Sequence, residues 1–235
     1  LYTISGEPAL KATADCAHVI EFLLDMARLT GQSNYRDAAI RTGTYLVKNF
    51  HEKGYFIGGT LDNPNCCDKE ACIIALEAYL ALYENTEDQI WLEAARIAGT
   101  LAETWIYMWE VPMQVDGVER FYPASCTTVG LQLITCGFSA VDMYLSRHSY
   151  AFRRLAQLTG DRHYDLVAKI LHHNTKHVIQ LDDAPGKEKY YGYKLADMQI
   201  EHWGMGLGRG YGLNSGWLPW VNTNPIMDIY RWSRD

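Results

Sequence analysis

One helical pattern occurs three times along the chain, and this repeat constrains the fold more than any other feature. Each copy begins with an aromatic residue, which is Tyr35, Trp91 or Tyr164. Apolar or small residues follow at the third, fourth and seventh positions after the aromatic. The first copy has Ala38, Ala39 and Thr42 there. This spacing is typical of one buried face of an α-helix, so the sequence predicts three related helices.

A more uniformly apolar segment precedes each of these striped helices. The three segments are Leu10–Leu29, Cys72–Tyr83 and Thr127–Tyr144, and the last can be extended to Leu158. A helix that is apolar on nearly all sides is buried, whereas a striped helix keeps one face in water. The chain is therefore expected to alternate inner and outer helices, which are joined at short glycine or asparagine turns.

The connections from each outer helix to the next inner helix are long. They are Gly54–Lys69, Pro112–Ser125 and Asp182–Gly216. Long loops at one end of a rigid scaffold are where functional sites usually lie. We predict an all-α fold with few short strands, in which helical hairpins form a single domain over residues 1–235. Three hairpins are too few for a closed ring, so the domain is an incomplete (α/α) toroid or a fragment of a longer chain.

Composition narrows the class of partner. The chain has 235 residues, of which 48% are hydrophobic and 21% charged, and its net charge is −7. These values are ordinary for a folded globular protein, and the negative charge argues against nucleic acid as a partner. No apolar run approaches the roughly 18 residues that a membrane span needs. The chain begins at Leu1 without a visible targeting signal, so we interpret it as a mature or trimmed chain of unknown compartment and oligomeric state.

Three acids surround the predicted start of the second inner helix. They are Asp62, Asp68 and Glu70. Acids in the first turn stabilise a helix dipole, and Asp68 could simply be the N-cap residue. In the functional interpretation, these carboxylates point at a substrate from the mouth of the toroid. Two carboxylates on opposite sides of a sugar are what glycoside hydrolysis usually needs.

A fourth acid, Asp142, interrupts an otherwise apolar segment that the pattern predicts to be helical. A buried and unpaired carboxylate is costly, so Asp142 needs either a cationic partner or a function. Arg147, His148 or an arginine from another hairpin could pair with it. Catalysis or contact with a sugar is the alternative.

The richest segment of the chain begins at Glu201. Glycines at every second position from 204 to 212 alternate there with larger residues, and aromatic and charged side chains lie on both sides. These are His202, Trp203, Arg209, Tyr211, Trp217 and Trp220. Alternating glycines allow a ligand to approach the backbone closely, although a merely packed loop would also fit. Aromatic faces pack on sugar rings, and an arginine can bind a carboxylate through two parallel hydrogen bonds.

Metal and cofactor motifs are weak by comparison. His173 and His177 have i, i+4 spacing but no third ligand, so a solvated helix face explains them better. Cys66, Cys67 and Cys72 do not reproduce the spacing of toroidal arabinofuranosidases that use a zinc-bound cysteine. No phosphate-binding loop or nucleophile elbow is present. The sequence therefore predicts neither a metal nor a cofactor.

Five stretches together carry a resemblance to a known family. They are 59–66 (GTLDNPNC), 128–134 (TVGLQLI), 201–203 (EHW), 209–213 (RGYGL) and 216–220 (GWLPW). They resemble bacterial six-hairpin enzymes related to β-glucuronidases and unsaturated glucuronyl hydrolases, over residue 55 to the end of the chain. The resemblance implies an (α/α) toroid that acts on a carbohydrate.

The leading hypothesis is thus a glycoside hydrolase for glycans that contain uronic acid. Its acid–base pair would be Glu201 with Asp68 or Asp142, and Glu201 could instead pair with Arg209 and only shape the loop. The substrate-binding residues would be Asp62, Glu70, His202, Trp203, Arg209, Tyr211, Trp217 and Trp220. A toroidal lyase using Tyr211 and His202, and a non-catalytic glycan-binding domain, are the alternatives. A terpene cyclase is disfavoured because the one Asp doublet, Asp182-Asp183, lies in a polar loop.

Overall fold

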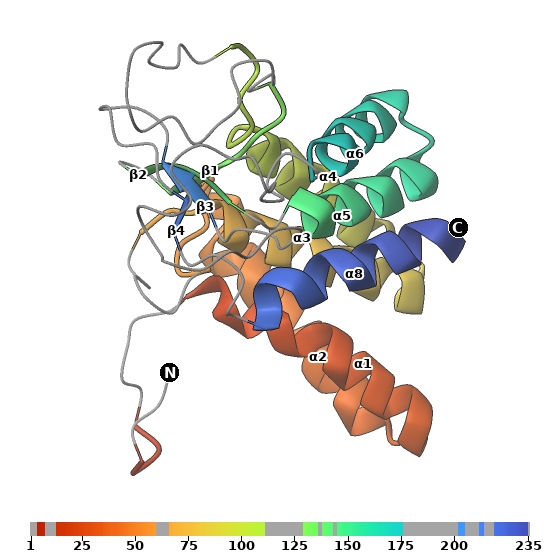
Figure 1. Ribbon diagram of the computed structural model, residues 1–235. Coiled ribbons are helices and arrows are strands. Elements are labelled where there is room, and N and C mark those ends of the chain that lie inside the picture. The colour runs from red at the N-terminus through yellow and green to blue at the C-terminus, as the bar shows by residue number, and fades with distance from the viewer. Residues whose placement is uncertain are drawn as a thin grey trace. The chain divides into compact units, whose positions relative to one another are not determined.

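A computed structural model shows how the predicted hairpins fold (Figure 1). It describes residues 4–7, 13–59, 66–110, 129–135, 138–142, 145–175, 202–204, 212–213 and 219–234. The chain divides into two compact units, an N-terminal unit of Leu1–Glu103 and a C-terminal unit of Thr104–Asp235. Among the helices so described, none is both long enough and apolar enough to cross a membrane.

The N-terminal unit consists of two helical hairpins. Its elements are the short helix η1 (Ala14–Ala17), α1 (His18–Thr30), α2 (Ser33–Asn49), the short helix η2 (His51–Lys53), α3 (Lys69–Thr86) and α4 (Gln89–Glu103). Helix α3 is buried on most sides, and Leu76, Tyr79 and Leu80 are fully enclosed. Trp91 of α4 stacks on Tyr79 and closes the core on one side. The predicted inner helix Cys72–Tyr83 and its outer partner are therefore confirmed.

Helix α1 differs from the expectation for an inner helix. It begins at His18 rather than at Leu10, and residues 8–12 lie outside the described part of the chain. Ile20 and Leu24 are buried, whereas Phe22 and Leu29 are 61% and 77% exposed. The apolar composition of the segment therefore overstated its burial, because its apolar residues occupy more than one face while only one face contacts α2 and α3.

The same turn closes all three hairpins. In each turn a threonine is the last helical residue and the next residue has a positive φ: Gly31 at 70°, Glu87 at 57° and Gly160 at 69°. The hydroxyls of Thr30, Thr86 and Thr159 each donate to the carbonyl four residues back and accept the N–H two residues ahead. An aromatic residue follows every one of these threonines after five positions. The internal repeat is therefore also a repeat of turn chemistry, and its second copy turns at Glu87 rather than near Asn85.

The C-terminal unit combines one hairpin, a further helix and a small sheet. Its helices are α5 (Leu145–Thr159), α6 (Arg162–Asn174) and α8 (Pro219–Arg234). Helix α8 packs on α5 through Trp232, whose indole N–H donates to the hydroxyl of Ser149 at 3.0 Å. The indole also stacks on His172 of α6 with a centroid distance of 4.4 Å, and the Arg153 guanidinium carbon lies 4.1 Å from its ring centroid. Trp232 therefore fastens α8 to both helices of the hairpin.

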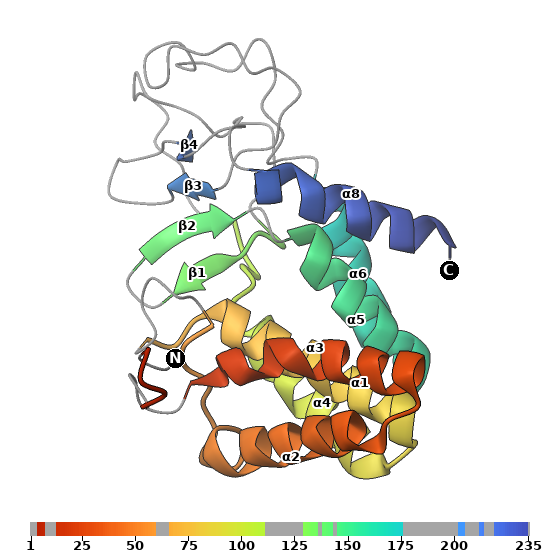
Figure 2. The same ribbon diagram turned by 90° about the horizontal axis from the view of Figure 1, so that it is seen from below.

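The predicted helix Thr127–Tyr144 was wrong. That stretch contains β1 (Leu133–Thr135) and β2 (Phe138–Asp142), which pair with β3 (His202–Gly204) and β4 (Gly212–Leu213). The four strands form one antiparallel sheet in the order β1-β2-β3-β4 (Figure 2). A short apolar run cannot be assigned to helix or strand by periodicity alone, and here it forms strands of three and five residues. The extension of that segment to Leu158 corresponds to α5, whereas its described part before residue 143 contains the two strands.

Candidate functional site

Two of the predicted site residues, Asp142 and His202, lie opposite each other on neighbouring strands of the sheet. In the pairing of β2 with β3, Asp142 lies directly opposite His202, and Val141 lies opposite Trp203. In an antiparallel pair, directly opposite positions belong to the same face of the sheet. Asp142 and His202 therefore share one face, although 59 intervening residues separate them in the sequence. This pairing is how the fold joins the isolated acid to the aromatic, glycine-rich segment.

The pairing of β1 with β2 adds a third polar residue to the same row. Leu133 lies opposite Val141, and Gln132 and Asp142 are the residues that adjoin this pair in the two segments. Gln132 also forms an antiparallel bridge with Ile106 on its other side. We call the three positions Gln132, Asp142 and His202 the polar row. The row crosses three consecutive segments of the sheet.

The side chain of Gln132 contacts His148, which lies in the first turn of α5. Its side chain is completely buried, and its Oε1 lies 2.5 Å from Nδ1 of His148, which is 1% exposed. Because a glutamine Oε1 can only accept, His148 donates from Nδ1. The Nε2 atom of Gln132 is also buried and has no hydrogen-bond partner among the residues that the structure describes. The row therefore contains a buried donor whose orientation is fixed by a histidine.

The segment before Gln132 is anchored on two sides. The amide of Asn174 in α6 donates to the carbonyl of Val129 at 2.6 Å. Gly130 has a φ of +85°, and a Cβ there would lie 2.7 Å from the Asn174 amide nitrogen. The backbone of Tyr107 bonds to Gly130 and Leu131. The described residues of the 128–134 motif that precede Gln132 are thus held by hydrogen bonds to Asn174 and Tyr107.

Asp68 lies in a different setting, at the start of α3 in the N-terminal unit. It is the N-cap residue and is fully buried. One carboxylate oxygen accepts the N–H of Ala71 at 2.7 Å, and the other accepts the N–H of Gly59 at 3.0 Å. A Cβ on Gly59 would lie 2.4 Å from the Asp68 carboxylate, so only glycine fits there. Asp68 thus fastens the 54–59 segment to the helix.

The first turn of α3 carries a second acid from the predicted set. Glu70 is partly buried, and its Oε1 lies 3.7 Å from Nζ of Lys69, which is fully buried. A buried ammonium needs a compensating anion nearby, and Glu70 is one such anion. The structure therefore brings Asp68 and Glu70 together at one helix end, where each has a structural role.

Solved structures of other proteins identify the fold. Cellobiose 2-epimerase from Bacillus thermoamylovorans matches 98% of this chain with a TM-score of 0.63 and 14% sequence identity. An unsaturated glucuronyl hydrolase specific for heparin matches 95% with a TM-score of 0.59 and 13% identity. A GH76 α-mannanase from Bacteroides thetaiotaomicron matches 94% with a TM-score of 0.56 and 15% identity. The chain has the (α/α)-toroid fold.

The match confirms, at the level of the fold, the resemblance to six-hairpin enzymes that the sequence predicted. This toroidal chain spans 58%, 59% and 53% of the lengths of those three chains. No protein-family model matches the sequence, and no curated protein matches it. The comparisons therefore establish the fold of the chain and leave its activity to be argued from its residues.

Several predicted site residues lie outside the described part of the toroid chain. These are Asp62, Glu201, Arg209, Tyr211 and Trp217. Trp203 lies in β3 and Trp220 in the first turn of α8, where the structure describes the backbone. Their assignment to substrate binding stays a prediction. Gln132 and His148 were missed as site residues, although Gln132 was visible as the polar interruption of an apolar run.

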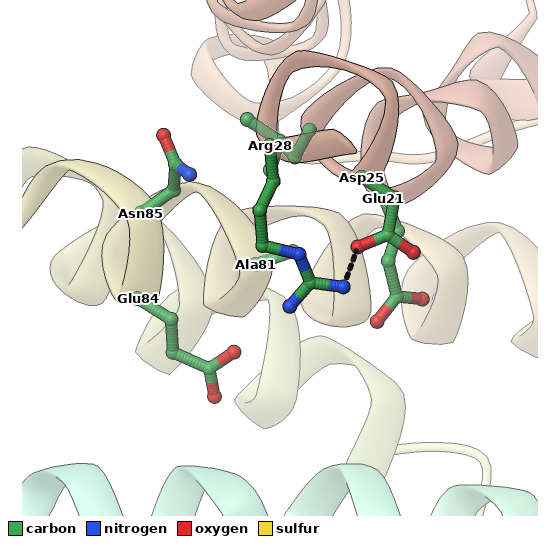
Figure 3. Close-up of a pocket in the computed structure, with 7 residues that line it drawn as sticks. Glu21, Asp25, Arg28, Ala81, Glu84 and Asn85 are labelled. Carbon is green, nitrogen blue, oxygen red and sulfur yellow. Dashed lines mark hydrogen bonds and ion pairs between the residues drawn. The ribbon is translucent and has the colours of Figure 1, made fainter. Parts of the chain in front are cut away.

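A polar cavity of about 240 Å³ lies between α1 and α3 in the N-terminal unit (Figure 3). Glu21, Asp25 and Glu84 line it together with Arg28, whose guanidinium donates to Asp25 at 2.9 Å. All four side chains are exposed. The cavity lies near the last turn of α3, at the other end of that helix from Asp68. It is therefore separate from the acids predicted to act on a substrate.

The shifted pKa values arise from burial. Burial lowers the pKa of His51 and raises that of Tyr79, and these two side chains meet edge to face in the N-terminal core. Burial also raises the pKa of the Cys16 thiol to about 11, which makes this thiol a poor nucleophile. In the C-terminal unit, burial and then the nearby charge of Arg153 lower the pKa of His172. Within the described ranges, no group of three or more His, Cys, Asp or Glu side chains could hold a metal ion.

Proposed function

We propose that this chain belongs to a carbohydrate-active enzyme, a glycoside hydrolase that acts on glycans containing uronic acid. The observation that carries the proposal is the polar row, which pairs Asp142 with His202 beside the predicted substrate segment. The fold likeness supports it, because the matched structures include a hydrolase of unsaturated glucuronyl groups and a mannanase. A fold alone does not determine chemistry, so the argument depends on the residues of the row.

In this proposal Glu201 is the general acid and Asp142 is its partner carboxylate. In the sequence, Glu201 directly precedes His202, and His202 lies opposite Asp142 in the sheet. Glycoside hydrolysis requires one carboxyl group to protonate the leaving oxygen and a second to act as base or nucleophile. Asp68 is the weaker partner because both of its oxygens already accept backbone N–H groups.

The remaining predicted residues would recognise the sugar. Arg209 would bind the uronate carboxylate through two parallel hydrogen bonds, with His202 and Tyr211 beside it. The aromatic faces of Trp203, Trp217 and Trp220 would pack on sugar rings. Asp62 and Glu70 would contact hydroxyl groups near the start of α3. The proposed ligand is thus an acidic oligo- or polysaccharide.

A glycan panel tests this function. The full chain is incubated with oligosaccharides that contain uronic acid and with matched neutral ones, and products are measured by released reducing sugar, ultraviolet absorbance and chromatography. Release of reducing ends from the uronate substrates supports the proposal, and Arg209→Lys should raise KM for these substrates. New ultraviolet absorbance would instead identify a lyase. An isomerised sugar without hydrolysis would identify an epimerase, and binding without any product would identify a glycan-binding domain.

A further inference from the structure

Helix α1 carries a row of apolar side chains on its solvent side. Val19, Phe22 and Leu29 are between 46% and 77% exposed, and Met26 is partly exposed. These four residues are spaced by three, four and three positions, which places them along one side of an α-helix. We call Val19, Phe22, Met26 and Leu29 the α1 row.

The opposite side of α1 forms the contact with the rest of the N-terminal unit. Ile20 and Leu24 are buried there, and α1 packs on α2 and α3 (Figure 2). Polar residues lie along one edge of the α1 row, and these are His18, Glu21, Asp25 and Arg28, all exposed. Single exposed apolar residues are normal on a protein surface, whereas a continuous apolar row with a polar edge marks a surface for another protein segment.

Helix α3 shows how a helix of the same kind is covered when it has neighbours on more sides. Both α1 and α3 are the first helix of a hairpin that closes with the threonine turn. Every residue of Ala71–Leu82 in α3 is buried except Glu77, and α3 packs on α1, α2 and α4. A helix that is apolar on most sides is one that other helices surround. The α1 row therefore lies on the side of α1 where a further neighbour would pack.

Helix α8 shows a similar arrangement within the C-terminal unit. Trp232 packs one side of this helix on α5 and α6. Ile226, Ile229 and Tyr230 are exposed along another side, and Ile226 and Tyr230 are one helical turn apart. Each compact unit thus contains a helix with an uncovered apolar side, as expected for hairpins taken from a ring that is not closed.

We propose that the α1 row is the docking surface for a further helical hairpin of the same toroid, and that this hairpin belongs to the same polypeptide. A toroid is a ring, and this chain spans 58%, 59% and 53% of the lengths of the three matched toroids. A large part of each matched chain thus has no counterpart in residues 1–235. The partner surface is an amphipathic helix whose apolar side has room for the ring of Phe22.

Two other occupants fit these observations less well. Two copies of a chain that spans more than half of a toroid would contain more chain than one ring holds, so a second copy is a poor partner for closing it. An anionic membrane would be repelled by Glu21 and Asp25 beside the α1 row and by the net charge of −7.

Photo-crosslinking identifies the occupant. Phe22→p-benzoylphenylalanine is introduced into the protein made from its complete natural reading frame, and the peptides linked by irradiation are identified by mass spectrometry. We expect a link to a segment of the same polypeptide outside residues 1–235. Val19→p-benzoylphenylalanine, in the same row, should link to the same segment. Ile97→p-benzoylphenylalanine is the control, because Ile97 is an exposed residue on α4, and it should give no reproducible link.

The melting temperature gives a second measurement that needs no crosslinker. Phe22→Ser should leave the melting temperature of residues 1–235 unchanged and lower that of the complete protein by a few degrees, because Phe22 is covered only in the complete protein. Equal effects at the two lengths overturn the inference. A link to a second copy or to a segment within residues 1–235, the lack of any reproducible link, or a complete reading frame without further helical segments also overturns it.

Discussion

The two described acids that were predicted to take part in catalysis occupy very different places. Asp68 begins a buried helix, and the backbone N–H groups of Gly59 and Ala71 occupy its two oxygens. Asp142 ends a short strand and lies opposite His202. An acid before an inner helix is what helix capping requires in any case. Asp142 lies on a strand, where helix capping does not apply.

This difference changes the weight of the sequence argument. The sequence offered a structural alternative for each acid, which was an N-cap for Asp68 and a cationic partner for Asp142. The helix start accounts for both carboxylate oxygens of Asp68, because they accept the N–H groups of Gly59 and Ala71. The comparison therefore favours Asp142 as the chemical residue and Asp68 as the structural one.

The sharpest test of the comparison exchanges each carboxylate for its amide. Asp142→Asn should lower kcat on a hydrolysed glycan by about 10²–10⁴-fold, because an amide cannot act as a base or nucleophile. Asp68→Asn should lower it much less, because an asparagine still caps a helix. Steady-state kinetics at matched protein concentration would measure both. Equal losses in the two variants would show that the two acids do not differ in role.

Adding a methyl group at position 59 should destabilise the arrangement around Asp68. Gly59→Ala places a Cβ about 2.1 Å from the backbone nitrogen of Ala71. We expect the free energy of unfolding to fall by about 1–3 kcal/mol, since neither the helix backbone nor the buried carboxylate can move away easily. Urea denaturation followed by circular dichroism would measure the change. Gly54→Ala is the control for backbone strain, because Gly54 has a positive φ but open space around its Cβ position.

Removing the cap itself should have a smaller effect. Asp68→Ala leaves the N–H groups of Gly59 and Ala71 without their acceptor, and it should cost about 0.5–2 kcal/mol of stability. Asp68→Ser, which can still cap the helix, should recover part of that loss. Thermal denaturation of the three proteins would rank them. A stability equal to that of the wild type in Asp68→Ala would mean that the cap is dispensable.

The hairpins were predictable from the sequence because their signal is local. An aromatic residue with small residues three and four positions later defines a buried helical face, and α2, α4 and α6 carry this pattern. The turns were found for the same reason, although the second copy was misplaced. A left-handed residue that is not glycine, Glu87, hid the threonine that all three turns share.

The sheet was not predictable, because its pairing is not local. Nothing in the sequence near Asp142 shows that His202 will lie opposite it, because 59 residues, including α5 and α6, separate the two positions. The apolar run at 127–144 also fits a helix as well as strands when it is considered alone. Gln132 could have been suspected, because a polar residue within an apolar run needs a partner. Its partner, His148, becomes visible when α5 is in place.

The smallest expected effect concerns pH and the C-terminal unit. Burial lowers the pKa of His172, which stacks on Trp232 and lies near Arg153, so the folded chain binds this proton more weakly than the unfolded chain. Stability is therefore unaffected by His172 above its unfolded pKa of about 6.5, falls as the pH drops below that value, and reaches its full loss below the folded pKa. In His172→Gln, the thermal melting temperature should depend less on pH between pH 7 and pH 5. His163→Gln, which alters an exposed histidine on the same helix, should leave that slope in place. A wild-type slope in His172→Gln would show that protonation of His172 does not loosen α8, and the acid sensitivity would then have to come from other groups, such as His51, whose pKa is also lowered by burial.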